Sequence, residues 1–276
     1  MARRFQYGPL LAVVVLAGLG AAMWHYYPRR AIPESPTTAT PDTAPTSAPV
    51  PLTPPAVQFP IDQVQVPVEE ATPLPALEDS DAAFLDALST AFGGPVGEWL
   101  VAEFVIPKLV ATIDNVPNRK MMRNIYAARP LSGTPGVAEA DGRLWLDEAG
   151  YARYDTAVAL LERVDLRQAV GVYVRFHPLF QQAYRDIAPP GTTFNDRLVA
   201  VIDHLLAAPE SDGPVEVRRA TDGSGRLQYV DPAREGASVG HKAMWRLGPD
   251  HAARVKARLR ELRAILAGQR PRVGGG

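Results

Sequence analysis

How this chain folds is decided by one stretch, Thr193-Phe194-Asn195-Asp196-Arg197-Leu198-Val199-Ala200-Val201-Ile202-Asp203-His204-Leu205-Leu206. Thr193 is a residue type that caps helices, and the apolar residues after it occupy most of the circumference of a helix. A helix that is apolar nearly all round is buried, so we expect residues 194–206 to be the central helix of a helical domain. Its few polar side chains must then face water, a partner or internal hydrogen bonds.

The sequence around this helix is also mainly helical in pattern. Residues 78–267 are therefore expected to form a single α-helical domain with one small β-hairpin, from residues 215–218 and 226–230. Residues 143–146 have the composition of a short strand. Helical spacing of apolar residues, with starts at Ser80, Asp165 and Thr193 and with Pro and Gly at the breaks, predicts helices over residues 80–92, from 95 onward, and over 106–115, 151–164, 166–187, 194–206, 232–246 and 250–266.

An apolar run lies near the N-terminus. Residues 8–24 carry no charge and would span roughly 26 Å as a helix, the short end of what crosses a bilayer core. Tyr7 on one side, and Trp24 and Tyr26 on the other, suit the two membrane interfaces. Residues 1–30 are therefore expected to be a membrane anchor.

A cleaved signal peptide is the alternative, with Gly20 and Ala22 as small residues at a cleavage site. Bulky aromatic residues and Arg29 directly after the run favour a retained anchor. No Lys or Arg occurs from residue 31 to residue 107. Because retained flanks are enriched in Lys and Arg, we expect the N-terminus in the cytoplasm and the domain outside it. Nucleic acid is then not an expected partner.

Residues 31–77 are rich in Pro, Thr, Ala, Ser and Val. Such a composition buries too little apolar surface to offset the entropy of ordering, which predicts a disordered linker with polyproline II bias. The linker is either a spacer that lifts the domain off the membrane or an inert tether. Val57-Gln58-Phe59-Pro60-Ile61 and Val64-Gln65-Val66-Pro67-Val68 are more apolar and are candidates for short docking segments. The polar residues 268–276 are expected to form a flexible tail.

Four polar side chains form two neighbouring stripes along the predicted central helix. Asp196 and Asp203 are seven residues apart, which places them on one face about 10.5 Å apart by helix rise. Arg197 and His204 form a second stripe. Such a set can do general acid–base chemistry if a cleft opens there, and the separation is similar to that in inverting glycosidases, roughly 6.5–9.5 Å. The alternative is that Asn195, Asp196, Arg197 and Asp203 tie neighbouring helices and loops together.

A second polar and aromatic cluster comprises Tyr151, Arg153, Tyr154 and Asp155. It can bind a sugar or peptide by stacking and hydrogen bonding, or it can line the edge of the core. The histidines of the domain lack zinc-site spacing and the chain has no cysteine, so neither a metal nor a cofactor is expected. Acidic residues dominate residues 78–116 and basic ones residues 242–276. The two regions can attract each other, or the basic one can face anionic lipid or an acidic envelope polymer.

Several motifs occur in combination: Ala111-Thr112-Ile113-Asp114-Asn115-Val116-Pro117, Pro178-Leu179-Phe180-Gln181-Gln182-Ala183-Tyr184, Phe194-Asn195-Asp196-Arg197-Leu198, Arg246-Leu247-Gly248-Pro249 and Val255-Lys256-Ala257-Arg258-Leu259-Arg260-Glu261-Leu262-Arg263. Together they resemble the bacterial domain-of-unknown-function family numbered 3014, over residues 74–266. The resemblance implies a proteobacterial envelope protein with a single anchor, and it implies no activity, ligand or catalytic residue.

These features predict a single-pass protein of the bacterial inner membrane, held by residues 8–24, with a periplasmic domain. Its function is expected to be binding or scaffolding of an envelope protein or cell-wall component, without enzymatic activity. The alternative is an envelope hydrolase that acts on a glycan or peptide through Asp196, Asp203 and His204.

Overall fold

The computed structural model describes residues 56–68, 73–94, 96–97, 99–129, 136–211, 213–221 and 226–268, and most of these lie in helices. The longer helices are α2 (Asp81–Phe92), α3 (Val105–Asn115), α5 (Asp155–Arg163), α6 (Leu166–Arg185), α7 (Phe194–Leu206), α9 (Val239–Leu247) and α10 (Pro249–Leu266). The short ones are α4 (Glu148–Ala152), α8 (Pro232–Glu235) and the 3₁₀ turns η2 (Ile61–Gln63), η3 (Leu77–Asp79) and η4 (Arg123–Ile125). The prediction of a mainly helical domain is confirmed.

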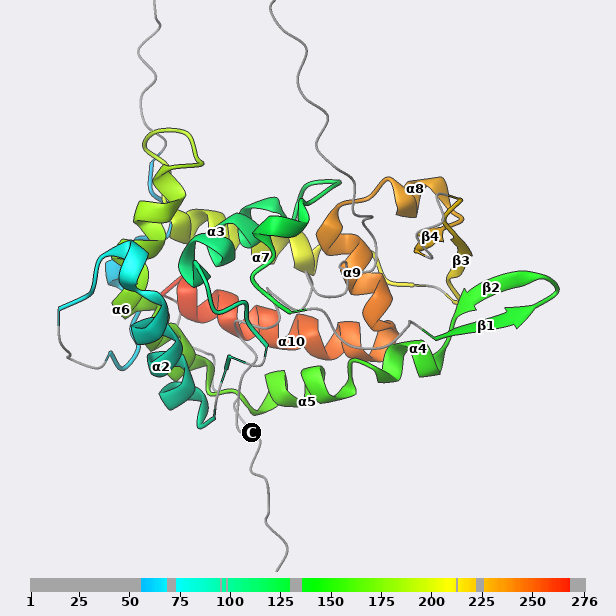
Figure 1. Cartoon of the computed structure of the whole chain (residues 1–276), viewed down its shortest axis with the longest axis horizontal. Helices are drawn as coiled ribbons and strands as arrows, with labels where there is room; N and C mark the ends of the chain where they lie inside the picture. The colour runs from blue at the N-terminus through cyan, green and yellow to red at the C-terminus, as the bar shows by residue number, and fades with distance from the viewer. Residues whose placement is uncertain are drawn as a thin grey trace, which may run out of the picture.

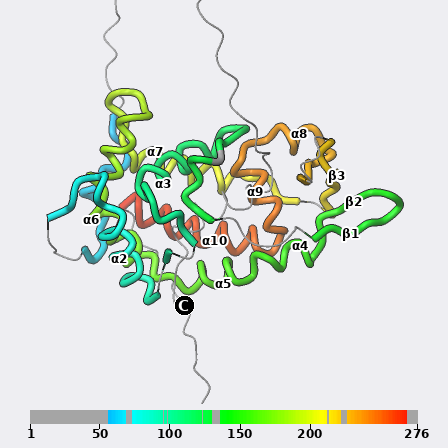
Figure 2. The backbone as a smooth tube through the Cα atoms, in the orientation of Figure 1, coloured from blue at the N-terminus to red at the C-terminus, as the bar shows by residue number. Residues whose placement is uncertain are grey.

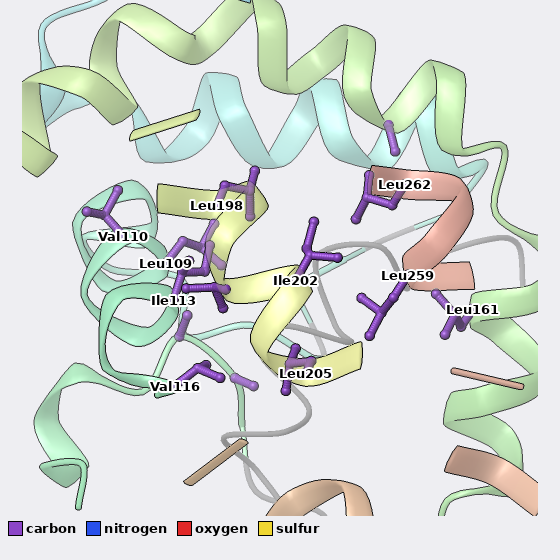
Figure 3. Close-up of a cluster of buried hydrophobic side chains, with 14 of the residues drawn as sticks. Leu109, Val110, Ile113, Val116, Leu161, Leu198, Ile202, Leu205, Leu259 and Leu262 are labelled. Atoms are coloured by element: carbon purple, nitrogen blue, oxygen red, sulfur yellow. The ribbon is translucent and has the colours of Figure 1, made fainter. Parts of the chain in front are cut away.

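Helix α7 has the predicted bounds and lies between α3 and α10, as Figure 3 shows. Leu198, Ile202 and Leu205 point from α7 into a cluster with side chains of α3, α5 and α10. Burying one such side chain stabilises the fold by about 1.5–3 kcal/mol. The helix is therefore the centre of the core, as the apolar pattern around its circumference predicts.

Helix α10 runs along the length of the domain and packs against α5, α6, α7 and α9 (Figure 1). Helices α2 and α6 lie towards one end of α10, and the small sheet lies beyond the other end, as the tube in Figure 2 also shows. The apolar cluster that joins α2, α3, α5, α6, α7, α9 and α10 is the main core of the described residues.

The sheet is larger than the predicted hairpin. β3 (Glu216–Arg219) and β4 (Leu227–Tyr229) pair antiparallel, which confirms the hairpin, and β2 (Arg143–Leu146) forms where a strand was expected. β1 (Val137–Ala140) pairs with β2, and β2 pairs with β3, so the four strands lie in the order β1-β2-β3-β4. The sheet packs its own small apolar cluster against Trp245 of α9.

Three predicted helices differ from those observed. The stretch predicted as residues 151–164 is divided into α4 and α5, and the stretch predicted as 232–246 is divided into α8 and α9. The described residues after Pro95 form no helix before α3; instead Leu100 pairs with Ala128 in an isolated β-bridge. Apolar residues at helical spacing also fit an extended segment that pairs with a distant one, which short periodicity does not distinguish.

The segment of residues 56–68, within the stretch assigned to the linker, lies against the helical domain. Val64 is 8% exposed and belongs to the main core, and Phe59, Ile61 and Val66 pack against it. The apolar character of these residues offsets the ordering entropy that the proline-rich composition alone would not. We call residues 56–68 the docked segment.

The predicted anchor at residues 8–24, the remainder of the linker before residue 56, and residues 269–276 of the tail lie outside the described residues. Among the helices that the structure does describe, none combines the length and apolar character needed to cross a bilayer.

Candidate functional site

The start of α7 holds the docked segment. Thr193 caps the helix by accepting a hydrogen bond from the N–H of Asp196, as predicted. The Asp196 carboxylate accepts hydrogen bonds from two successive main-chain N–H groups, those of Gln58 (3.1 Å) and Phe59 (2.7 Å). A carboxylate at a helix N-terminus is also stabilised by the helix dipole. Because successive N–H groups of an extended chain point to opposite sides, Asp196 holds a bend in the main chain at Gln58 and Phe59.

Asn195 completes this contact from the adjacent position. Its side chain is buried (1% exposed), and its Nδ2 donates to the carbonyl oxygen of Phe59 at 2.8 Å. The Tyr173 hydroxyl donates to Asn195 Oδ1 at 3.3 Å. Burial raises the pKa of Tyr173 well above its usual value, and the charge of Asp196 adds to that effect. The tyrosine therefore stays a neutral donor that orients the asparagine.

The remaining contacts to the docked segment come from α6 and α10. The guanidinium of Arg167 donates to the carbonyl oxygen of Gln65 at 2.6 Å. Gly171 leaves room for the segment, because a Cβ at that position would overlap the carbonyl oxygen of Pro67. The guanidinium carbon of Arg263 lies 5.9 Å from the centre of the Phe59 ring. The docking surface is thus formed by Arg167, Gly171, Asn195, Asp196 and Arg263.

Arg197 and Asp203 form two ion pairs on different sides of α7. Arg197 donates from Nε to Asp114 Oδ1 at 2.8 Å and from Nη2 to the Asp114 carbonyl oxygen at 2.6 Å. Asp203 accepts two bonds from Arg263, one of them to Oδ2 at 2.9 Å. The first pair joins α7 to α3, and the second joins α7 to α10. Through Arg263, Asp203 also supports the contact to Phe59.

His204 lies at the other end of α7, against α9. Its Nε2 is 2.8 Å from Ser238 Oγ, and Ser238 caps α9 by accepting from the N–H of His241. The rings of His204 and His241 stack at 4.2 Å with an interplanar angle of 8°. Burial lowers the pKa of His204, and the nearby His241 and Arg197 lower it further. The neutral ring is therefore the favoured form in the fold.

The second predicted cluster is divided among separate contacts. Tyr154 is buried, and burial raises its pKa. The Arg153 guanidinium lies 5.7 Å from the Tyr154 ring centre, and the Tyr151 ring lies against Gly248. Asp155 is 2.9 Å from Nε2 of His251. These four residues thus hold the junction of α4 and α5 against neighbouring elements.

Three arginines of α10 also have partners within the domain. Arg254 makes two bonds to Glu162, and Arg258 bonds Glu261 and the carbonyl oxygens that end α5. Arg263 pairs with Asp203. These bonds favour a structural role for this basic helix over a lipid-facing one, although the partners lie in α5, α7 and α10 itself rather than in the acidic region 78–116.

The polar residues of α7 therefore act separately. Asp196 holds the docked segment, Asp203 pairs with α10, and His204 contacts α9. A cavity of about 70 Å³ beside α7 is lined by apolar residues and Tyr173, and by none of these three. The described residues contain no cluster of His, Asp or Glu suited to a metal ion. This arrangement suits binding of a chain segment better than acid–base chemistry on a shared substrate.

Comparison with known families matches part of the chain. A family model described as "Protein of unknown function (DUF3014)" matches residues 105–263, which is more than half of the 276 residues. The chain belongs to this family. The region shared with the family begins at the first residue of α3 and includes all five residues of the docking surface, but not the docked segment. Comparisons with curated proteins and with solved structures give no match.

Sequence reasoning identified Asn195 and Asp196 but missed their relation to the docked segment, and it missed Arg263, Asp114 and Ser238. Asn195 and Phe59 are 136 positions apart, and Arg263 and Asp203 are 60 apart. Such pairings leave no local signal. Ser238 did carry a local signal in the sequence. Serine is a preferred residue at the N-cap of a helix, where it accepts from an N–H three residues later, here that of His241.

Proposed function

We propose that this family member is a membrane-tethered, extracytoplasmic module that binds an envelope protein or cell-wall component. One observation carries the proposal: the most distinctive polar residues of the central helix, Asn195 and Asp196, hold the main chain of a separate segment. A domain whose polar groups recognise main chain is suited to binding. The apolar, uncharged residues 8–24 and the base-free stretch after them support the tether and its orientation.

The rival function is an envelope hydrolase that uses Asp196, Asp203 and His204. General acid–base catalysis requires its groups to reach one substrate at hydrogen-bonding distance. The three side chains instead bond the docked segment, α10 and α9 in turn. Their separate partners support the binding function over the hydrolase.

A pair of fusions tests the orientation. A reporter that is active only outside the cytoplasm, fused after Gly276, should be active, and a reporter active only in the cytoplasm should be silent. Lysines placed within residues 31–55 should reduce export, because basic flanks are retained. A silent external reporter together with an active cytoplasmic one would refute the tethered arrangement.

Crosslinking in living cells tests the binding function. A photo-reactive residue is placed at Gln168, which is exposed next to Arg167 of the docking surface, and the control is Val230, which is exposed near the sheet. Discrete adducts to an envelope component should form from position 168 and not from position 230. Equal adducts from both positions, or none from either in correctly oriented protein, would contradict a binding role for this face.

A further inference from the structure

The docked segment contains the same short motif twice. Val57-Gln58-Phe59-Pro60-Ile61 and Val64-Gln65-Val66-Pro67-Val68 both read Val-Gln, an apolar residue, Pro, and an aliphatic residue, seven positions apart. The first copy is bound by Asn195, Asp196 and Arg263, and the second by Arg167 and the space beside Gly171. The docking surface therefore accommodates this motif at two places.

The surface recognises mainly the backbone of the segment. Each hydrogen bond from it goes to a main-chain N–H or carbonyl group, at Gln58, Phe59 and Gln65. Pro60 has φ −61° and ψ 133°, which is close to polyproline II. Domains that bind extended peptides use main-chain hydrogen bonds for affinity and a few side-chain contacts for specificity. Here the side-chain contacts are the cation over the Phe59 ring and the burial of Val64.

The docked segment lies on the main core, most of which is formed by side chains of other elements. Val64 is its one residue in the main core among those that the structure describes, while Val57 and Val68 are 47% and 41% exposed. The region shared with the family contains the docking surface and excludes the segment. The matched region therefore includes the receptor surface of this chain.

We propose that the docking surface is a binding site for a segment of a partner protein with the motif Val-Gln-aromatic-Pro-aliphatic, and that residues 56–68 occupy it when the partner is absent. The proposal rests on the binding function proposed above and names its ligand class. Asp196 receives two consecutive N–H groups of the ligand, and Asn195 donates to the carbonyl of the aromatic residue. Arg263, held by Asp203, covers the aromatic ring.

The tethered segment competes with any partner. A segment joined to its receptor by a short connection has an effective concentration of about the millimolar order. A free peptide therefore binds the intact protein weakly, and binds strongly once the docked segment is released. The partner must overcome this competition, which restricts binding to partners held close to the domain.

The test uses the full chain in membranes or detergent and a fluorescent synthetic peptide of residues 56–68. Phe59→Asp in the chain removes the ring that lies under Arg263 and packs against the main core, and puts a charged side chain in its place, which should release the segment. The F59D protein should bind the peptide at least about tenfold more tightly than the unchanged protein, because the internal competitor is weakened. A peptide with Ala in place of Phe59 should bind less well.

Receptor variants in the F59D background locate the site. Asp196→Ala should lower peptide affinity at least about tenfold, since two main-chain N–H groups lose their acceptor. Glu162→Ala is the matched control, because it also removes a hydrogen-bonded carboxylate, but Glu162 lies on α5 and pairs with Arg254 of α10, away from the docking surface. Equal affinity in the D196A and E162A proteins would overturn the assignment of the surface.

Every other result decides the proposal as well. A folded F59D protein that does not bind the peptide overturns it, and so does loss of the helical fold on F59D, since the segment would then be part of the core. Self-association of the unchanged protein that Asp196→Ala removes would assign the site to a second copy instead. Peptide binding without any adduct in cells would refute the proposed function while leaving the specificity of the surface in place.

Discussion

The helical bundle and the sheet corner of this domain are stabilised in different ways. The bundle, formed by α2, α3, α5, α6, α7 and α10, is packed by apolar side chains, and Phe194 at its centre stacks on Phe180 and meets the edge of Tyr184. The corner, formed by the four strands with α8 and α9, has a second and smaller apolar cluster: Val215, Val217, Leu227, Tyr229 and Trp245.

The buried aromatic side chains of the corner also make hydrogen bonds. The Tyr229 hydroxyl donates to the carbonyl of Lys242 at 2.8 Å and accepts from Arg246 Nε at 3.3 Å. Trp245 Nε1 donates to the carbonyl of Pro209 at 2.7 Å. We therefore expect the stability of the bundle to fall most when a buried side chain is made smaller. The stability of the corner should fall when a buried group loses its hydrogen-bond partner.

The largest expected effect is in the bundle. Phe194→Ala removes a fully buried ring from the aromatic cluster and should lower the free energy of unfolding by about 3–5 kcal/mol. Phe104→Ala is the matched control, because Phe104 is 61% exposed and its loss should cost about 0.5 kcal/mol or less. Urea unfolding followed by circular dichroism measures both. Similar losses would contradict the assignment of Phe194 to the centre of the core.

The next effect is in the corner. Tyr229→Phe keeps the ring and removes the hydroxyl between Lys242 and Arg246, so it should cost about 1–3 kcal/mol. Tyr173→Phe makes the same change in the bundle, where the hydroxyl donates one longer bond to Asn195. The same unfolding measurement should show a smaller loss for Y173F. The reverse order would show that the buried hydroxyl contributes more to stability in the bundle than in the corner.

The two regions also differ in what the sequence could predict. In the bundle, the caps at Asp165 and Thr193 are confirmed, because a cap bonds within three residues of itself. Ser80 was expected to cap α2 in the same way, but its backbone is helical (φ −81°, ψ −16°) and its hydroxyl donates to the carbonyl of Leu77. A cap residue needs an extended backbone, and the sequence does not specify that.

In the corner, only the local pairing was predicted. β3 and β4 pair across a short stretch, Asp222-Gly223-Ser224-Gly225, whose composition is typical of a turn, so the hairpin is a local feature of the sequence. The pairing of Leu144 with Val217 joins strands that are far apart in the chain, and neither strand carries a sign of the other. The candidate site has the same limit: Asp196 was identified as a polar residue on a buried helix, whereas its ligand at Gln58 is non-local.

A third prediction concerns the ion pair between α7 and α10. Asp203→Asn weakens a bidentate contact to Arg263 whose side chains are about half-exposed, so it should cost about 0.2–1 kcal/mol. The loss should shrink in 1 M NaCl, because the Debye length falls to roughly 3 Å there and exposed charges attract each other less. Thermal unfolding at low and high salt measures this. An unchanged or raised melting temperature, together with lost function in cells, would favour a catalytic role for Asp203.

The two regions meet where α7 ends against α9, at the stacked rings of His204 and His241. Ser238 Oγ and His204 Nε2 are 2.8 Å apart, a distance at which the serine can donate to a neutral ring. Burial, followed by the charges of His241 and Arg197, lowers the pKa of His204 in the fold. The unfolded chain, where a histidine titrates near pH 6.5, therefore binds the proton more readily than the folded one.

Acidification should loosen this junction, with the smallest effect of the four because the ring is partly exposed. The stabilisation from neutral His204 is complete above about pH 6.5, and it is lost as the pH falls below that value towards the lower folded pKa. Urea unfolding between pH 7.5 and about 5.5, where carboxylates stay ionised, should show a free energy of unfolding that falls as the pH is lowered. His204→Gln should reduce the slope without abolishing it, because burial also lowers the pKa of His177. An equal slope in both proteins would show that His204 keeps its ordinary pKa and that the junction does not sense protons.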